Sequence, residues 1–574
     1  MLNATVDEAL SKAEFQRTIF SERPRRADLL RIAAAMSVNT KAFRLRVHRN
    51  HPFEFIASAL PPFLSYSDRR VECVLGDYDD SLTLAIGGDA DIELVWLDFD
   101  RYKLDANELL DWLFGRIEAL RAKSRAPILV AASSKQDTTA CDFNRQLRER
   151  STNMAGVRVL PLDEIAASLG PDYHDARMSQ VGATRLSERA NIEIARHMGL
   201  CWLPAALAPR LKAVVFDLDN TLWKGVLGED GIEGIVIDEK FKALHAKAAA
   251  LADSGLFIGL LSRNEPADVD AMLASGRMGH LAEKISARSI SWNSKADGMK
   301  HIADTLRIGY DAILFVDDNP GELAAIAAAC PGIHLLFASP DPAETTRALD
   351  FYPGLFTWGS DSTDALRAND LATNDARDAL RAEAGSERDY LESLKLVLRI
   401  AANPHNHRTR LQQLSQKTNQ FNLALRRLSE IDVDEALNDP RQAAVGIWLN
   451  DRFSDSGLIG ALFARLEEEN RLRVEELCVS CRALGRGIED AMIIAALNAA
   501  IDAIEHATNT RILEIGFAYD QGPRNEPARS WLRKFSGQGL GERGFAILPW
   551  NAEERAATVR NLPIRIKQGA PDAI

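Results

Sequence analysis

The sequence has few cysteines, no excess of basic residues and no long apolar run. Its 574 residues include six cysteines and carry a formal net charge of −13. Scattered cysteines suit a reducing cytosol rather than a disulfide scaffold. An acidic chain argues against a nucleic-acid partner, because phosphate recognition normally needs a basic face. No apolar run approaches the ~20 residues of a membrane helix, and the start "MLNATVDEALSKAEF" has no secretion pattern. We therefore expect a cytoplasmic protein with no membrane or nucleic-acid partner.

What the sequence does contain is an ordinary globular composition spread over several domains. Hydrophobic residues make up 46% of the chain and charged residues 26%, as in folded soluble domains. A chain of this length exceeds a single hydrophobic core, so roughly three or four domains are expected.

The N-terminal third predicts a parallel sheet covered by helices. Residues 1–42 look helical, and from residue 43 to about 205 short apolar runs such as "FRLRV" and "IELVWLDF" alternate with amphipathic stretches. This alternation predicts a mostly parallel α/β sheet. The pattern resembles the SGNH-hydrolase architecture, but no G-D-S turn or D-x-x-H pair stands in the expected places, and His174 has no partner serine. We expect a non-catalytic scaffold.

The rest of the chain predicts two further domains, which makes the fold class multidomain α/β. In residues 206–345, apolar runs again alternate with stretches of helical pattern, and residues 346–390 are predicted to form a helical connector. Residues 391–574 mix long apolar strands with the helix "IEDAMIIAALNAAIDAIEHA", an order that predicts an antiparallel-rich α/β domain.

The most informative stretch is "LKAVVFDLDNTLWKG", where an apolar run ends on Asp217 and Asp219. Open parallel sheets bind ligands at the carboxyl ends of their strands. Two carboxylates at such an edge suit Mg²⁺, which prefers oxygen ligands and leaves room for phosphate. Asp217 is a candidate nucleophile that would form an aspartyl-phosphate, and Asp219 a candidate general acid and base.

Further polar residues follow later strands of the same region in a fixed order. "LFIGLLSRN" supplies Ser262 to bind a phosphoryl group, and "SWNSKADG" supplies Lys295 as a cation for developing charge. "AILFVDDNPGE" supplies Asp317 and Asp318, which complete the predicted metal ligands together with the first two acids. Any one of these residues has an ordinary structural explanation, but the succession favours a phosphoryl-transfer site.

This succession resembles the haloacid-dehalogenase (HAD) superfamily over about residues 210–340. The sequence is similar to the FkbH-like proteins of polyketide and related pathways at residues 215–231 and 315–322. The similarity continues further on in "LQQLSQKTNQFNLALRR", "DRFSDSGLIG" and "SCRALGRGIE". The resemblance implies a HAD phosphatase domain fused to a GNAT-like domain. It also implies an activity: such proteins take a glyceryl unit from 1,3-bisphosphoglycerate, remove phosphate, and load the glyceryl group as a thioester on an acyl carrier protein.

The chain departs from that family at the position before the motif serine. Many members have a cysteine there, whereas this chain has Leu261, and Arg263 stands where a lysine is common. A glyceryl-cysteine at that position is impossible here. Either another thiol serves, or the acyl group passes directly to the carrier, or the substrate differs.

The C-terminal region contains a glycine-rich turn between a strand and a long helix. "RALGRG" places Arg482, Gly485 and Gly487 where free N–H groups at a helix start bind phosphate or pyrophosphate. The spacing resembles the motif with which GNAT acyltransferases hold the pantetheine arm of coenzyme A, and Asn525 before a later helix fits the same pattern. A structural turn is the alternative. We predict recognition of phosphopantetheine or coenzyme A, and ligand contact by the polar cluster "QKTNQFNL".

Three functions stay open at this point. The first is a Mg²⁺-dependent HAD enzyme that loads a glyceryl unit on an acyl carrier protein. The second is a phosphatase that acts on a phosphosugar or other metabolite and whose GNAT-like domain acylates it, without carrier loading. The third is a non-enzymatic scaffold that binds a carrier, which the intact set of acids argues against.

Overall fold

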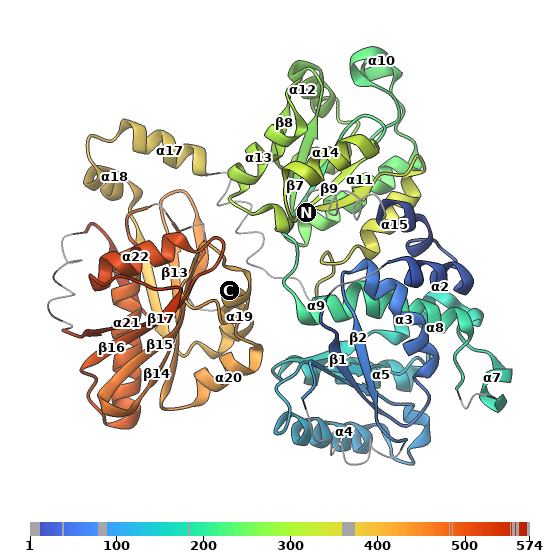
Figure 1. The fold of residues 1–574 in the computed structure, drawn as a ribbon, viewed down its shortest axis with the longest axis horizontal. Coiled ribbons are helices and arrows are strands. Elements are labelled where there is room, and N and C mark those ends of the chain that lie inside the picture. Colours follow the sequence, from blue (N-terminus) through green and yellow to red (C-terminus); the bar gives the residue numbers. More distant parts are fainter. Residues whose placement is uncertain are drawn as a thin grey trace. The chain divides into compact units, whose positions relative to one another are not determined.

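The chain folds into two compact units. In the computed structural model these are Met1–Ser360 and Asp361–Ile574 (Figure 1). The structure describes residues 12–36, 40–78, 89–181, 184–358, 373–480, 483, 484, 486–551, 553, 557 and 562–570. Each unit is described separately below.

The first unit contains two parallel sheets of five strands. One has the order β2-β1-β3-β4-β5 and the other the order β10-β9-β6-β7-β8. The strands are β1 (Phe43–Arg49), β2 (Val71–Leu75), β3 (Ile92–Trp96), β4 (Ile128–Ala131), β5 (Val157–Leu160), β6 (Ala213–Phe216), β7 (Phe257–Ser262), β8 (Ile285–Ile290), β9 (Ile313–Asp317) and β10 (His334–Phe337). The predicted parallel α/β architecture of both regions is confirmed.

Helices cover both faces of these sheets, and the inner strands β4, β6 and β7 are accordingly rich in apolar residues. The inner strands β1 and β3 also carry the buried polar residues Arg46, His48 and Glu93. The helices are α2 (Arg26–Ala35), α3 (Glu54–Tyr66), η2 (Phe99–Arg101), α4 (Ala106–Arg121), α5 (Thr138–Thr152), α6 (Leu162–Leu169), η3 (Gly170–Tyr173), α7 (Ala176–Val181), α8 (Glu188–Arg196), η4 (His197–Trp202), α9 (Leu203–Leu207), α10 (Leu227–Gly234), α11 (Glu239–Asp253), α12 (Pro266–Ala274), η5 (Gly279–Lys284), α13 (Lys295–Leu306), η6 (Tyr310–Ala312), α14 (Pro320–Ala329) and α15 (Pro342–Phe351). On the first sheet, α4 and α5 pack on one face and α3 on the other.

The second unit is built on one mixed sheet in the order β17-β16-β15-β14-β13-β11-β18, with β12 beside β15. Its strands are β11 (Val397–Ala402), β12 (Phe421–Asn422), β13 (Gln442–Asn450), β14 (Asp455–Leu466), β15 (Arg471–Val479), β16 (Glu514–Asp520), β17 (Arg543–Pro549) and β18 (Arg565–Gln568). Most neighbours are antiparallel, as expected, but β15 runs parallel to β16 and β11 runs parallel to β18.

The helices of the second unit include one that has the dimensions of a membrane span. They are α17 (Asn374–Glu383), α18 (Glu387–Leu394), η7 (His405–His407), α19 (Arg408–Lys417), α20 (Glu430–Asn438), η8 (Glu468–Asn470), α21 (Glu489–Thr508) and α22 (Glu526–Ser536). By length and composition alone, α21 could cross a membrane, so the expectation that no segment reaches this size is corrected. Most of its apolar side chains are buried against the sheet, as in the core helix of a globular domain.

Candidate active site at the edge of the second sheet

Three polar residues meet at the carboxyl edge of the second sheet. Asp217 directly follows β6, and Ser262 and Asp317 are the last residues of β7 and β9, the two neighbours of β6 in the sheet. All three side chains are buried. Parallel strands bring their carboxyl ends to one edge, and the structure therefore brings these predicted residues together.

Lys295 joins the group from the first turn of α13. Its Nζ lies 2.6 Å from Asp317 Oδ2 and 3.0 Å from Asp217 Oδ1. The helix is fixed in place by its cap, because Ser294 accepts a hydrogen bond from the N–H of Asp297. One buried cation thus faces two buried carboxylates, and the cluster keeps a net negative charge.

Burial and this residual charge shift the pKa values of the cluster. Burial raises the pKa of Asp217 to about 7, and the negative charge of Asp317 adds to the rise, against the opposing effect of Lys295. Burial alone would lower the pKa of Lys295, yet the two carboxylates raise it. Burial and Asp317 also raise the pKa of Asp318. The site holds more negative charge than the protein itself neutralises, which is what a divalent cation would relieve.

The carboxylates offer a set of ligands that fits Mg²⁺. Asp217, Asp317 and Asp318 each have one ligand atom within 4.8 Å of the other two. Asp217 Oδ1 is buried and makes no hydrogen bond, although Lys295 lies within ion-pairing distance of it. A buried unbonded carboxylate oxygen is costly without a partner, and hard oxygen ligands are what Mg²⁺ takes. Three of the four predicted metal residues therefore form one cluster, and metal binding stays a prediction.

Asp219 has a different environment from the other three acids. Its Oδ1 accepts hydrogen bonds from Trp223 Nε1 at 2.9 Å and from the N–H of Leu227 at 3.0 Å. Its Oδ2 accepts one from Asn264 Nδ2 at 2.8 Å. These contacts turn the carboxylate toward the flap that follows β6 and leave it outside the three-carboxylate cluster. The general acid and base role of Asp219 stays a prediction, and its carboxylate does not belong to the three-carboxylate cluster.

Asn264 is a site residue that the sequence analysis missed. Besides its bond to Asp219, its Nδ2 lies 3.2 Å from Ser262 Oγ, so one amide group links the two predicted functional side chains. It is buried. Its position two residues after Ser262 in "LSRN", at the same strand end, was the one sequence feature that indicated a place in the site.

Leu261 and Arg263, which depart from the pattern of the family that the sequence resembles, both make structural contacts. Leu261 is buried, and its Cδ1 lies so close to Gly298 of α13 that a Cβ there would come within 2.5 Å. Arg263 Nη1 pairs with Glu322 Oε1 of α14 at 3.1 Å. The cysteines found free in the described part of the chain are Cys73, Cys141, Cys201, Cys330 and Cys478. None of these five stands at the strand ends that form this site.

In the second unit, only part of the predicted cofactor site can be placed. Arg482 and Gly485 lie outside the described residues, as does Cys481. Gly487 has a φ of 73°, in the left-handed region that favours glycine. Its neighbour Arg486 is buried and pairs with Asp451 at 2.9 Å, which anchors the turn.

Asn525 is used inside the protein. Its Nδ2 donates to the carbonyls of Asn422 at 2.9 Å and Asp520 at 2.8 Å, and its Oδ1 accepts from the N–H of Gly522 at 2.8 Å. The side chain is buried and fixes the start of α22 to β12. Contact between Asn525 and a cofactor stays a prediction. The hydrogen bonds described here show that Asn525 positions the backbone around it.

Strands β15 and β16 pair only over Arg471–Val474 and Glu514–Phe517. Beyond that point β12 lies beside β15, with Phe421 opposite Val479, and the N–H of Asp520 donates to the carbonyl of Leu423 at 2.8 Å. Residues 421–423 thus bridge the diverging strands. The prediction that the cluster "QKTNQFNL" faces a ligand is wrong for Phe421 and Asn422, which are buried in this contact.

Comparison with known proteins gave structural matches only. No protein-family model and no curated protein matches the sequence. One similar structure is the N-terminal part of the protein BF1531 from Bacteroides fragilis, which contains a phosphatase domain and was crystallised with Mg. The match has a TM-score of 0.48 and 19% sequence identity, and it covers 57% of this chain and 98% of that chain. Another is a tandem GNAT protein from the clavulanic acid biosynthesis pathway, with a TM-score of 0.18 at 18% identity, over 24% of this chain and 43% of that one.

At these scores we base the class on the chain's own strand order and site. The first unit has a parallel sheet with acids at its carboxyl edge, and the second has a mixed α/β sheet. This is the combination that the sequence resemblance to FkbH-like proteins implies.

Proposed function

We propose that the chain is a Mg²⁺-dependent phosphoryl-transfer enzyme of the HAD type. It would dephosphorylate a glyceryl phosphate donor resembling 1,3-bisphosphoglycerate and load the glyceryl unit on an acyl carrier protein, in polyketide or related biosynthesis in the cytoplasm. The observation that carries the proposal is the buried pairing of Asp217 with Lys295 beside Asp317 and Asp318.

Each residue has a defined task in this proposal. A carboxylate oxygen of Asp217 attacks the phosphorus of the donor's phosphate ester, which leaves the acyl phosphate intact, and the bond from phosphorus to the ester oxygen breaks as that oxygen takes a proton from Asp219. Water then attacks the aspartyl-phosphate, gives its proton to Asp219 and releases inorganic phosphate. Ser262 and Lys295 bind the phosphoryl oxygens, and Lys295 balances the charge that builds up on them.

The metal would be held by the carboxylates of Asp217, Asp317 and Asp318. When bound, Mg²⁺ supplies positive charge to the phosphoryl group and fixes its orientation.

The acyl part of the proposal involves the second unit. The thiolate of the carrier's pantetheine arm would form the C–S bond of the thioester while the donor's acyl-phosphate C–O bond breaks and phosphate leaves. Arg482, Gly485 and Gly487 are the proposed contacts for the phosphopantetheine or coenzyme A phosphate, and Asn525 supports them. The GNAT-like strand-turn-helix order favours this assignment.

The test is a loading assay with the full chain. The protein is incubated with Mg²⁺, 1,3-bisphosphoglycerate and pantetheinylated carrier protein from its own gene neighbourhood, and the carrier is weighed by mass spectrometry. We expect a glyceryl mass increase with the wild type and with Asp304→Asn, a change on the exposed side of α13, and none with Asp217→Asn. No adduct on any such carrier would defeat the loading proposal.

A second candidate is a phosphatase for a phosphosugar or other metabolite, combined with acylation of the same molecule. It is favoured by Leu261, which removes the family thiol, and by the lack of a cysteine among the described residues of the site. Phosphate release without any carrier, together with turnover of acetyl-coenzyme A, would select this candidate.

A further inference from the structure

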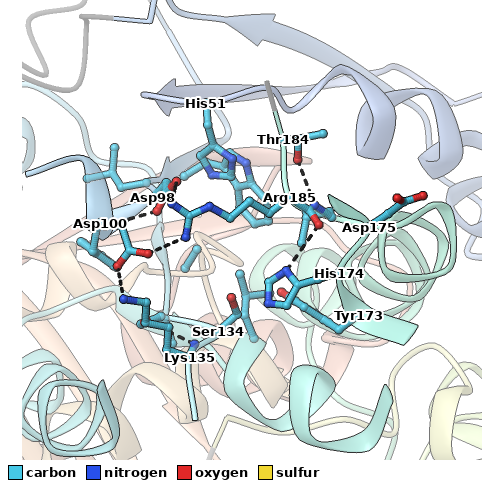
Figure 2. A pocket seen from close by; sticks show the side chains of 18 of the residues that line it. His51, Asp98, Asp100, Ser134, Lys135, Tyr173, His174, Asp175, Thr184 and Arg185 are labelled. Carbon is cyan, nitrogen blue, oxygen red and sulfur yellow. Dashed lines mark hydrogen bonds and ion pairs between the residues drawn. The ribbon is translucent and has the colours of Figure 1, made fainter. Parts of the chain in front are cut away.

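The first sheet has a cavity of its own at its carboxyl edge, separate from the acids of the second sheet. The cavity has a volume of about 360 Å³ and is lined by residues that follow β1, β3 and β4 and by the segments around Tyr173 and Arg185 (Figure 2). The strand order 2-1-3-4-5 reverses direction between β1 and β3. Sheets of this order bind ligands outside the carboxyl ends of their strands at that reversal.

The inner wall combines aromatic surface with hydrogen-bond donors that have no partner. The ring of His51 stacks on Trp96 at 5.2 Å, and Trp96 and Tyr173 are each 1% exposed. Trp96 Nε1 and the Tyr173 hydroxyl are buried without a hydrogen-bond partner, and Ser134 lies near that hydroxyl, where it opposes the rise that burial causes in the pKa of Tyr173. Buried donors are normally paired. An indole N–H can only donate, so its missing partner is an acceptor atom.

The charges at the mouth of the cavity are already paired. Asp100 lies 2.7 Å from Lys135 Nζ and 2.6 Å from Arg185 Nη1, and Asp98 lies 3.9 Å from Arg185 Nη2. Figure 2 shows the Arg185 side chain reaching toward both acids. Each cation faces a carboxylate, so the mouth offers little net charge to a phosphate or other multiply charged anion.

The two histidines add no positive charge deep in the cavity. Burial lowers the pKa of His51 to about 4, with the nearby Arg101 and Arg185 acting in the same direction against Asp98. His174 lies at the exposed rim, with its Nδ1 3.3 Å from the carbonyl of Arg185. The interior is therefore neutral, aromatic and rich in donors.

We infer that this cavity binds a neutral organic molecule with an acyl group, an amide or an ester, whose carbonyl oxygen accepts hydrogen bonds from Trp96 Nε1 and the Tyr173 hydroxyl. The apolar part of the ligand packs against the stacked Trp96 and His51. Two kinds of molecule carry a carbonyl group of this type: an amide chain such as pantetheine, and an acylated sugar. The inference does not depend on the proposed phosphoryl transfer, because it uses other residues on another sheet.

The test is isothermal titration calorimetry on the full chain with three probes: pantetheine, methyl N-acetylglucosaminide and inorganic phosphate. We expect saturable binding of at least one of the two amides and none of phosphate in the cavity. The same binding is expected in Asp217→Asn, which separates this site from the phosphoryl site. Pantetheine alone would identify an amide chain, and the glucosaminide alone an acylated sugar.

The decisive variant is Tyr173→Phe, which removes only the hydroxyl. Because that hydroxyl has no well-formed hydrogen bond in the free protein, the thermal midpoint should change little, whereas affinity should fall roughly 3- to 10-fold for one lost hydrogen bond to the ligand. Trp96→Phe, checked by circular dichroism, should lower affinity similarly, and Tyr310→Phe, a matched change near the second sheet, should not. Failure of both amides to bind, or binding that both cavity variants leave intact, would overturn the inference.

Discussion

Lys295 Nζ lies 2.6 Å from Asp317 Oδ2 and 3.0 Å from Asp217 Oδ1, so one ammonium group links the ends of β9 and β6 from the start of α13. All three side chains are buried. Removal of one partner from a buried ion cluster leaves charges that water no longer solvates. Both the stability and the chemistry of this edge therefore depend on Lys295.

Lys295→Met should lower the rate of phosphate release by about 10²–10³-fold, because a fixed cation near the transferring group is lost. It should also lower the free energy of unfolding by roughly 3–5 kcal/mol. Phosphate release and thermal unfolding measure the two effects. The matched control is Lys300→Met on the same helix, where an exposed lysine pairs with Asp304; equal effects of the two changes would contradict the role of Lys295.

Asp217→Asn and Asp219→Asn should differ in kind. The first should abolish phosphate release, because an amide forms no acyl-phosphate, and beryllofluoride with Mg²⁺ should no longer bind. The second should slow release by about 10²–10⁴-fold and still bind beryllofluoride. In Asp219→Asn, the amide oxygen can still accept a hydrogen bond, but the new N–H₂ group must face a donor on whichever side it lies, so some loss of order is expected as well. Wild-type turnover by Asp217→Asn would remove the nucleophile assignment.

Asn264→Ala tests a positioning role. The change leaves Asp219 Oδ2 and Ser262 Oγ without their shared donor, so kcat should fall about 10-fold while KM stays within about twofold, since one hydrogen bond of orientation is lost. The neighbouring change Arg263→Ala removes only the surface pair with Glu322 and should leave kcat unchanged. A rise in KM without a change in kcat would show that Asn264 binds substrate instead.

Two glycine-to-alanine changes should have opposite effects on stability. In Gly298→Ala the new Cβ would lie 2.5 Å from Leu261 Cδ1 and 2.8 Å from Ser289 Oγ, so we expect a loss of about 1–3 kcal/mol and lower activity through displacement of α13. Gly115 in α4 has nothing within 4 Å of that position, so Gly115→Ala should gain about 0.5–1 kcal/mol. Chemical denaturation measures both; a stabilising Gly298→Ala would contradict the packing described here.

Glu476→Gln should make the second unit more stable above neutral pH. Burial raises the pKa of Glu476 to about 7, against the N–H groups of Arg426 and Ala424 and the charge of Arg427. In the unfolded chain this carboxyl ionises near pH 4.5, so between that pH and about 7 the folded form holds a proton that the unfolded form has lost. Wild-type stability therefore falls as pH rises through this window and is constant above it.

The difference between Glu476→Gln and wild type should accordingly grow from pH 5 to pH 7.5 and reach on the order of 1–3 kcal/mol. Urea unfolding at several pH values gives the measurement. Glu542→Gln, at an exposed position of the same unit, should show no such trend. A gap that shrinks with rising pH would contradict the buried, protonated carboxyl.

The sequence was informative where a local pattern determines position. An apolar run followed by an acid marks a strand end, and parallel strands gather their ends at one edge, so Asp217, Ser262 and Asp317 could be assigned before the fold was known. The turn of Asp219 toward Leu227 and Asn264 could not, because it depends on backbone N–H groups and an amide that carry no pattern of their own.

Contacts between distant segments were also beyond prediction. The insertion of residues 421–423 between β15 and β16 joins stretches nearly sixty and about a hundred residues apart, and nothing in "QKTNQFNL" indicates that Phe421 is buried. The cavity of the first sheet is likewise assembled from several loops, and its strongest sign, the unpaired donors of Trp96 and Tyr173, exists only in the folded chain.

The second sheet ends at β10, and its last residue is bonded by a side chain from near the start of the chain. Gln16 Nε2 donates to the carbonyl of Phe337 at 2.6 Å, and Gln16 Oε1 accepts from the N–H of Phe337 at 3.1 Å. One glutamine amide thus satisfies both backbone groups of a residue on an edge strand, as another strand would. Unpaired edges recruit strands from other molecules. Expression of the phosphoryl-transfer part without the helical residues 12–19 should therefore yield protein that self-associates through this edge.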